Sequence, residues 1–173
     1  ETFYDKCHLF GFAGEDKVYN RGFREAPIVR FRGMNIKLIT CYDVRFPVFC
    51  RNVDNAYDVL LVVANWPMAR INAWRTLLAA RAIENECYVA IAGSVGNLPK
   101  VQNMDIQYAQ SAVFTPCDFA FPYDGRRAEA TPNSEMILVA DVDLNQLNEL
   151  HTYGSVRNLR DRRKDLYELK FKK

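Results

Sequence analysis

Short apolar runs of strand length, separated by turns, place the strongest constraint on the fold of this chain. Two runs, at 27–31 and 35–40, flank Arg32-Gly33-Met34 and predict a hairpin. The run at 57–64 is rich in Val and Leu, which predicts a buried strand. The segment 68–86 carries apolar residues at helical spacing and predicts a helix. Strands and helices therefore mix, which indicates an α/β fold.

The second half of the chain continues this pattern with fewer helices. Strands are predicted at 87–95, 110–115 and 135–142, a short helix at 143–149, and loops at 98–104 and 116–132. Most strand connections after Val95 contain no helix, which favours a mixed sheet over repeated βαβ units. A chain of 173 residues suits one domain spanning 1–173.

Composition excludes several classes of function. The chain is 49% hydrophobic and 25% charged, as in soluble globular proteins, and its net charge of +2 gives no strong attraction to nucleic acid or membrane. The longest apolar run is too short to span a bilayer, and residues 1–6 lack the apolar core of a signal peptide.

Cysteine and histidine usage bears on compartment and cofactors. The five cysteines are odd in number and show no CxxC spacing, which predicts separate thiols in a reducing compartment, the cytoplasm. His8 and His151 are the two histidines, too few for a histidine-rich metal site. We expect no metal and no cofactor.

Cys41 lies where a predicted strand ends, and a short helix is expected at 47–52. A strand-to-helix turn holds a nucleophile outward, and helix N–H groups favour a thiolate. The alternative is a small buried core cysteine, which is the interpretation for Cys7, Cys50, Cys87 and Cys117.

Three segments together resemble the nitrilase superfamily of carbon–nitrogen hydrolases. The segment from Cys41 to Pro47 (CYDVRFP) is similar to the family's nucleophile motif. The segment from Tyr4 to Phe10 (YDKCHLF) resembles the one that carries its catalytic lysine. The segment from Arg81 to Asn85 (RAIEN), followed by Tyr88-Val89, resembles the passage after the nucleophile.

The likeness to subfamilies is divided. Residues 1–85 are most similar to the ω-amidase branch, whereas residues from about 90 onward are closer to the nitrilase domain of acetyltransferase–nitrilase fusions. The two likenesses indicate either a natural intermediate branch or a joined sequence, with the junction near 85–95.

The resemblance implies hydrolysis of a non-peptide C–N bond in small linear amides through a Glu–Lys–Cys triad. Cys41 would attack the amide carbonyl, with Lys6 as a fixed cation and the backbone N–H of Tyr42 as a donor to the oxyanion. The triad glutamate would precede residue 1, so we expect the domain to lack its N-terminal segment. Glu15 resembles a second glutamate that orients the substrate.

Three further residues are assigned to the substrate pocket by the resemblance: Trp66, Asn65 and Arg45. Trp66 is equally well interpreted as a core residue. Arg45 and Arg75 suit a substrate carboxylate, but structural ion pairs are the simpler interpretation for both.

The family fold is an α-β-β-α sandwich that pairs into dimers, of which this chain would form a partial domain with mixed sheets. We therefore expect a homodimer or larger homo-oligomer, an amide substrate and water as reactants, and a second chain carrying the N-terminal part as one way to complete the fold. Missing strands would leave an exposed sheet edge.

Two alternatives to the amidase remain open. One is a catalytically incompetent fragment or pseudoenzyme that acts as a binding module. The other is a Cys–His hydrolase, which requires His8 or His151 within hydrogen-bond reach of Cys41.

Overall fold

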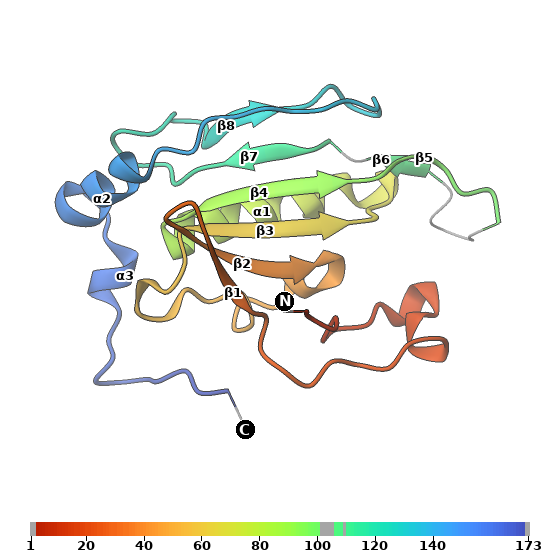
Figure 1. Ribbon diagram of the computed structural model, residues 1–173, viewed down its shortest axis with the longest axis horizontal. Helices are drawn as coiled ribbons and strands as arrows, with labels where there is room; N and C mark the ends of the chain where they lie inside the picture. The colour runs from red at the N-terminus through yellow and green to blue at the C-terminus, as the bar shows by residue number, and fades with distance from the viewer. Residues whose placement is uncertain (1–2, 101–105, 109, 172–173) are drawn as a thin grey trace.

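A six-stranded mixed sheet forms the framework of the computed structural model, which describes residues 3–100, 106–108 and 110–171. The strand order is β1-β2-β3-β4-β7-β8, and β5 and β6 form a separate two-stranded ladder (Figure 1). The strands are β1 Ile28–Phe31, β2 Met34–Thr40, β3 Val59–Ala64, β4 Tyr88–Gly93, β5 Val95–Asn97, β6 Ile106–Tyr108, β7 Ala112–Phe114 and β8 Arg126–Glu129. The α-helices are α1 Ile71–Asn85, α2 Leu144–Tyr153 and α3 Asn158–Asp161.

The centre of the sheet is parallel and its flanks are antiparallel. β2 pairs with β3, and β3 with β4, in parallel register, with Ile36 opposite Val59 and Val59 opposite Tyr88. β1, β7 and β8 join by antiparallel pairing. Parallel strands end at the same edge of a sheet, so the residues that follow Thr40 and Ala64 are brought together there.

One face of the sheet is packed against α1. Leu60 and Val62 of β3 belong to the same buried cluster as Trp74 and Leu78 of α1. The helix ends at Asn85, because the next residue adopts a left-handed conformation (φ 46°) that cannot continue it. Burial of these apolar side chains holds α1 against the sheet, so that helix and sheet form two packed layers.

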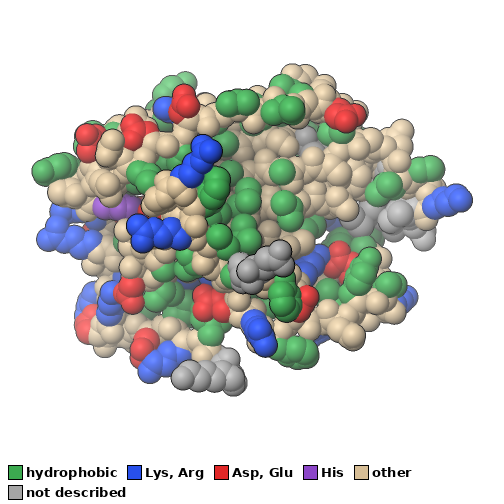
Figure 2. All heavy atoms as spheres, viewed as in Figure 1, with side chains coloured by type: hydrophobic (Ala, Val, Ile, Leu, Met, Phe, Trp, Pro, Cys, Tyr) green, Lys and Arg blue, Asp and Glu red, His purple; other side chains and the backbone are tan. Residues whose placement is uncertain are grey.

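The opposite face of the sheet is only partly covered. α2 packs over one end of it, where Leu147 contacts Val59 and Tyr88. Toward the other end of β3, the side chain of Val63 is 48% exposed. Figure 2 shows apolar side chains gathered over the middle of this face. A contiguous apolar surface on a sheet usually marks a place where another layer packs.

The predicted hairpin, the strand at 57–64, the helix at 68–86 and the mixed sheet are confirmed. Residues 68–70 form a separate 3-10 turn before α1. The short helix predicted at 143–149 is α2, and Asp143 caps it, since its side chain accepts a hydrogen bond from the N–H of Asn145 at 2.8 Å.

Three expectations for the second half are wrong. No strand forms at 135–142: Ile137 and Val139 are 88% and 82% exposed, and the segment enters no ladder among the described residues. β8 forms inside the predicted loop 116–132. The predicted strand 87–95 is interrupted after Gly93 and followed by β5. Of the predicted loop 98–104, residues 101–104 lie outside the described residues.

The described residues contain neither a membrane-spanning helix nor a cluster of metal-binding side chains. No helix among them has the length and hydropathy to cross a membrane. Within the same residues, no group of three or more His, Cys, Asp or Glu side chains is arranged to hold a metal ion.

Candidate active site

Cys41 is placed by a sharp turn at the end of β2. Thr40 is still extended, whereas Cys41 adopts φ 48° and opens the 3-10 helix Cys41–Arg45. Positive φ is uncommon for a residue with a side chain and often marks a functional position. The helix expected at 47–52 is absent, because the helical turn begins at Cys41 itself and ends before Phe46.

Asp43 joins this turn to the segment that carries Lys6. Its carboxylate is fully buried. One oxygen accepts hydrogen bonds from the hydroxyl of Tyr4 and from the backbone N–H of Thr40, and the other from the backbone N–H of His8 at 3.0 Å. The ring Nδ1 of His8 lies 2.7 Å from that second oxygen. A buried carboxylate is tolerated only with such partners, so the two segments are tied together.

Lys6 is held by Glu15. The ammonium group lies 2.8 and 2.6 Å from the two carboxylate oxygens. One of these oxygens also accepts the backbone N–H of Phe10 at 2.8 Å. Both side chains are largely buried, so the pair is shielded from solvent and fixed in place.

Cys41 and Lys6 face the same cavity. Its volume is about 570 Å³, the size of a small-molecule site. It is lined by Tyr4, Asp5, Lys6, Leu9, Phe10, Glu15, Tyr19, Asn20, Thr40, Cys41, Val63, Ala64 and Asn65. Two features bring Cys41 and Lys6 to this cavity. The parallel strands β2 and β3 end at the same edge of the sheet, and the hydrogen bond between Asp43 and His8 holds the segment that carries Lys6 against that edge.

The surroundings of the Cys41 sulfur act in opposite directions on its pKa. Burial is the largest influence and raises the pKa of the thiol. The Lys6 cation opposes this rise, and so do hydrogen bonds with the backbone of Asn65 and Tyr42, whereas Glu15 adds to it. The sulfur lies 3.5 Å from the carbonyl oxygen of Asn65. The thiolate therefore depends on its polar neighbours.

Trp66 and Arg45 lie on the other side of the nucleophile. They line a small cavity of about 20 Å³ together with Phe10, Cys41, Tyr42, Asn65 and Arg70. Trp66 is buried and stacks on Trp74 with ring centroids 4.5 Å apart, so it is both a core residue and a cavity wall. The guanidinium of Arg45 lies over the Trp66 ring at 5.0 Å.

The two arginines considered for a substrate carboxylate have different surroundings. Arg75 forms an ion pair with Glu129 and donates to Gln110 at 3.0 Å, which is the structural interpretation. Arg45 has no ion pair in the part of the chain that the structure describes, and it contacts aromatic rings instead. Arg70 and Asp43 were not singled out from the sequence. Asp43 lies inside the nucleophile motif, whereas no local pattern distinguishes Arg70.

The Cys–His alternative finds no support in this geometry. His8 is engaged by Asp43 and stacks on Phe46 at 3.7 Å. His151 lies 3.0 Å from the carbonyl oxygen of Glu86. Among the described residues, neither histidine is a hydrogen-bond partner of Cys41.

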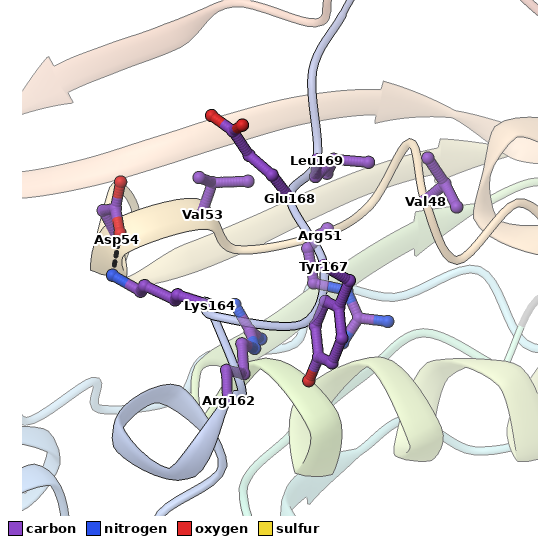
Figure 3. A pocket seen from close by; sticks show the side chains of 9 residues that line it. All are labelled: Val48, Arg51, Val53, Asp54, Arg162, Lys164, Tyr167, Glu168 and Leu169. Atoms are coloured by element: carbon purple, nitrogen blue, oxygen red, sulfur yellow. Dashed lines mark hydrogen bonds and ion pairs between the residues drawn. The ribbon is translucent and has the colours of Figure 1, made fainter.

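A second large cavity lies between the C-terminal segment and the turn at 48–54. It measures about 620 Å³, and Figure 3 shows the side chains that line it. Lys164 reaches Asp54, and Arg162 donates to the carbonyl oxygens of Asn52 and Glu84. Its lining includes no cysteine or histidine, and these two cations are already engaged. This cavity therefore offers no candidate nucleophile, although it is slightly larger than the one that Cys41 and Lys6 line.

Comparison with known proteins agrees with the geometry. The family model described as carbon-nitrogen hydrolase matches residues 2–152. The chain belongs to this family. The resemblance to carbon–nitrogen hydrolases noted from the motifs at Lys6, Cys41 and Arg81 is thus confirmed.

Relatives of this carbon–nitrogen hydrolase include proteins named as amidases. The chain is 54% identical to Omega-amidase YafV of Yersinia enterocolitica over 94 residues, which are 54% of this chain and 36% of that protein. It is 32% identical to the 2-oxoglutaramate amidase of Bacillus subtilis over 166 residues, 95% of this chain and 58% of that protein. The chain therefore spans only part of the length of these relatives.

A solved structure supports the fold of this carbon–nitrogen hydrolase. XC1258 from Xanthomonas campestris, a CN-hydrolase superfamily protein, superposes with a TM-score of 0.75 at 38% identity. The match covers 87% of this chain and 56% of that one. The mixed α/β architecture predicted from the sequence is the architecture of this neighbour.

Proposed function

We propose that the chain is the nucleophile-bearing part of an amidase that hydrolyses small linear amides of the ω-amidase type. The main support for this proposal is that Cys41 and Lys6 line the same cavity and that Cys41 lies at a strained turn. The names of the relatives, an ω-amidase and a 2-oxoglutaramate amidase, support the same reaction class.

In the first half-reaction the Cys41 sulfur attacks the amide carbonyl carbon. The developing oxyanion meets the backbone N–H of Tyr42 and the Lys6 ammonium. Loss of one such donor typically lowers the rate about 10²–10³-fold. The C–N bond then breaks, the nitrogen takes a proton and leaves as ammonia, and the acyl group remains on sulfur as a thioester.

In the second half-reaction water attacks the thioester and releases the acid. This step needs a general base within about 3 Å of the attacking water. Glu15 is already occupied by Lys6 and by the N–H of Phe10, which favours the role of a positioning glutamate. We infer that the base is a glutamate outside these 173 residues, supplied by a preceding segment or by another chain.

The direct test is ammonia release from succinamate and 2-oxoglutaramate. We expect weak or no turnover from residues 1–173 alone, and turnover once the N-terminal segment of a related amidase precedes them. Cys41→Ala should abolish this turnover, whereas Cys117→Ala, which removes an exposed thiol elsewhere, should not. Strong turnover by the chain alone would disprove the argument about the base. No turnover with the segment restored would overturn the amidase proposal.

A second candidate function is a non-catalytic binding module. The half-open apolar face of the sheet, with Val63 exposed, favours it. Such a module would bind its partner equally well after Cys41→Ala. Partner binding that survives this substitution would favour the binding module, provided that the protein with the added N-terminal segment also shows no turnover.

Assembly and compartment complete the proposal. A homodimer or larger homo-oligomer follows from the family likeness and would be measured by sedimentation. All five cysteines are free thiols, which suits the proposed cytoplasmic location.

A further inference from the structure

Arg70 places a guanidinium group beside Cys41, and among the described residues this group has no polar side-chain partner. Within the part of the chain that the structure describes, its buried Nη1 has no hydrogen-bond partner and its guanidinium forms no ion pair. By contrast, the buried Arg81 donates to the carbonyl oxygen of Val44 and to Glu84. A buried donor that stays unpaired lowers stability, so an unpaired cation in a cavity wall indicates a missing anion.

The backbone of Arg70 is held firmly. Its N–H donates to the carbonyl oxygen of Pro67 at 3.0 Å, and its own carbonyl accepts the indole N–H of Trp66 at 2.8 Å. The guanidinium carbon lies 5.6 Å from the ring centroid of Phe10 and 4.9 Å from that of Phe12. Aromatic faces therefore hold the cation without neutralising its charge, and its hydrogen-bond donors remain available.

The position of this cation suits the far end of a bound substrate. Arg70 and Cys41 line the same small cavity of about 20 Å³. Phe10, Cys41 and Asn65 line both this cavity and the 570 Å³ cavity that contains Lys6. A space of about 20 Å³ holds roughly one water-sized atom. It suits one carboxylate oxygen, with the rest of the ligand in the larger cavity.

The charge of the small cavity's wall also favours an anionic ligand. Arg45 also lacks an ion pair within the described residues and contributes a second positive charge to the small cavity. The Glu15 carboxylate is not available to neutralise these charges, because it is paired with Lys6. The two arginines thus make this wall of the small cavity positive, which favours an anionic ligand.

We propose that Arg70 binds the carboxylate of a short dicarboxylic acid monoamide whose amide end meets Cys41. This specificity rests on the proposed amidase function. The planar guanidinium offers paired donors that match the two oxygens of a carboxylate. Arg70 thereby selects amides with an anionic far end over neutral amides of equal length.

The test measures occupancy of the site without requiring turnover. Residues 1–173, preceded by the N-terminal segment of a related amidase, are treated with iodoacetamide, and modification is followed on the Cys41 peptide by mass spectrometry. Succinamate and butyramide are compared as protectants, because butyramide replaces the carboxylate with a methyl group. We expect succinamate to protect at concentrations at least about tenfold lower, since hydrogen bonds to charged groups contribute about tenfold to a hundredfold in affinity.

Variants assign this preference to Arg70. Arg70→Gln should abolish it, and Arg70→Lys should retain part of it through the remaining charge. Arg75→Gln is the matched control, because it removes a guanidinium that is engaged by Glu129, and it should keep the full preference. The thermal unfolding midpoint of each variant is measured to confirm that it is folded.

The outcomes separate this proposal from the amidase proposal. A full preference in Arg70→Gln, or no preference in the unchanged protein, would overturn the role of Arg70. An intact preference that depends on Arg70, together with no ammonia release, would support the carboxylate site and contradict the amidase function.

Discussion

Asp43 and His8 connect the segment that carries Lys6 to the turn that carries Cys41. The backbone N–H of His8 donates to the Asp43 carboxylate at 3.0 Å, and its ring Nδ1 lies 2.7 Å from the same oxygen. Asp43 follows Cys41 by two residues and His8 follows Lys6 by two, so this contact ties the turn at Cys41 to the segment that carries Lys6.

Neutralising Asp43 should loosen the site. Asp43→Asn replaces a buried acceptor oxygen with an NH₂ donor, which leaves at least one of its partners unsatisfied. The free energy of unfolding should fall by about 3 kcal/mol. Urea unfolding measures this change, and the exposed Asp141→Asn serves as the control and should shift it little. Equal effects of the two variants would contradict the role of Asp43.

Removing the Lys6 charge should make the Cys41 thiolate harder to form. Burial raises the pKa of this thiol and Lys6 opposes the rise, so Lys6→Met should raise the pKa further. Each unit of increase lowers the thiolate fraction at neutral pH about tenfold. The pH profile of iodoacetamide alkylation at Cys41 would move to higher pH. Lys17→Met, on an exposed lysine, should leave the profile in place.

Neutralising Glu15 should have the opposite effect on the thiol. The Glu15 carboxylate raises the pKa of Cys41, so Glu15→Gln should lower it and speed alkylation at a fixed neutral pH. Turnover should nevertheless fall, because Lys6 loses the partner that positions it. Measuring alkylation and ammonia release on one preparation separates the two effects. Slower alkylation in Glu15→Gln would show that positioning of Lys6 outweighs the charge.

Buried Cys50 should make the protein sensitive to alkali. Burial raises the pKa of its thiol from 9.0 to about 11. Below pH 9 both folded and unfolded states keep the proton, and stability is unaffected. Between pH 9 and 11 the unfolded state ionises first, so stability should fall by about 1.4 kcal/mol per pH unit, or about 2–3 kcal/mol in total.

Urea unfolding at pH 7, 9 and 10.5 measures this slope, with Cys50→Ala for comparison. The variant should be less stable at pH 7, because it leaves a cavity in a buried site, but its stability should decline less steeply with pH. An equally steep decline in the variant would assign the alkaline sensitivity to other groups.

Local sequence patterns determined the strands at the centre of the sheet, the helix α1 and the position of the nucleophile. The run before Cys41 and the run at 57–64 carry enough β-branched and apolar residues to specify strands without knowledge of their neighbours. The motifs around Lys6 and Cys41 also indicated the family and the two side chains proposed to react. These features depend on residues close together in the chain, which is why they can be read from it.

Tertiary structure alone decided which strands pair and which polar groups meet. The segment 135–142 has the composition of a strand but no ladder partner among the described residues, whereas β8, with two arginines and a glutamate, pairs with β7. Asp43 reaches partners 35 and 39 residues away, and Arg70 is notable only because its buried Nη1 has no hydrogen-bond partner among the described residues. Pairing and burial depend on long-range packing, so neither a ladder partner nor an unpaired charge can be read from a local pattern.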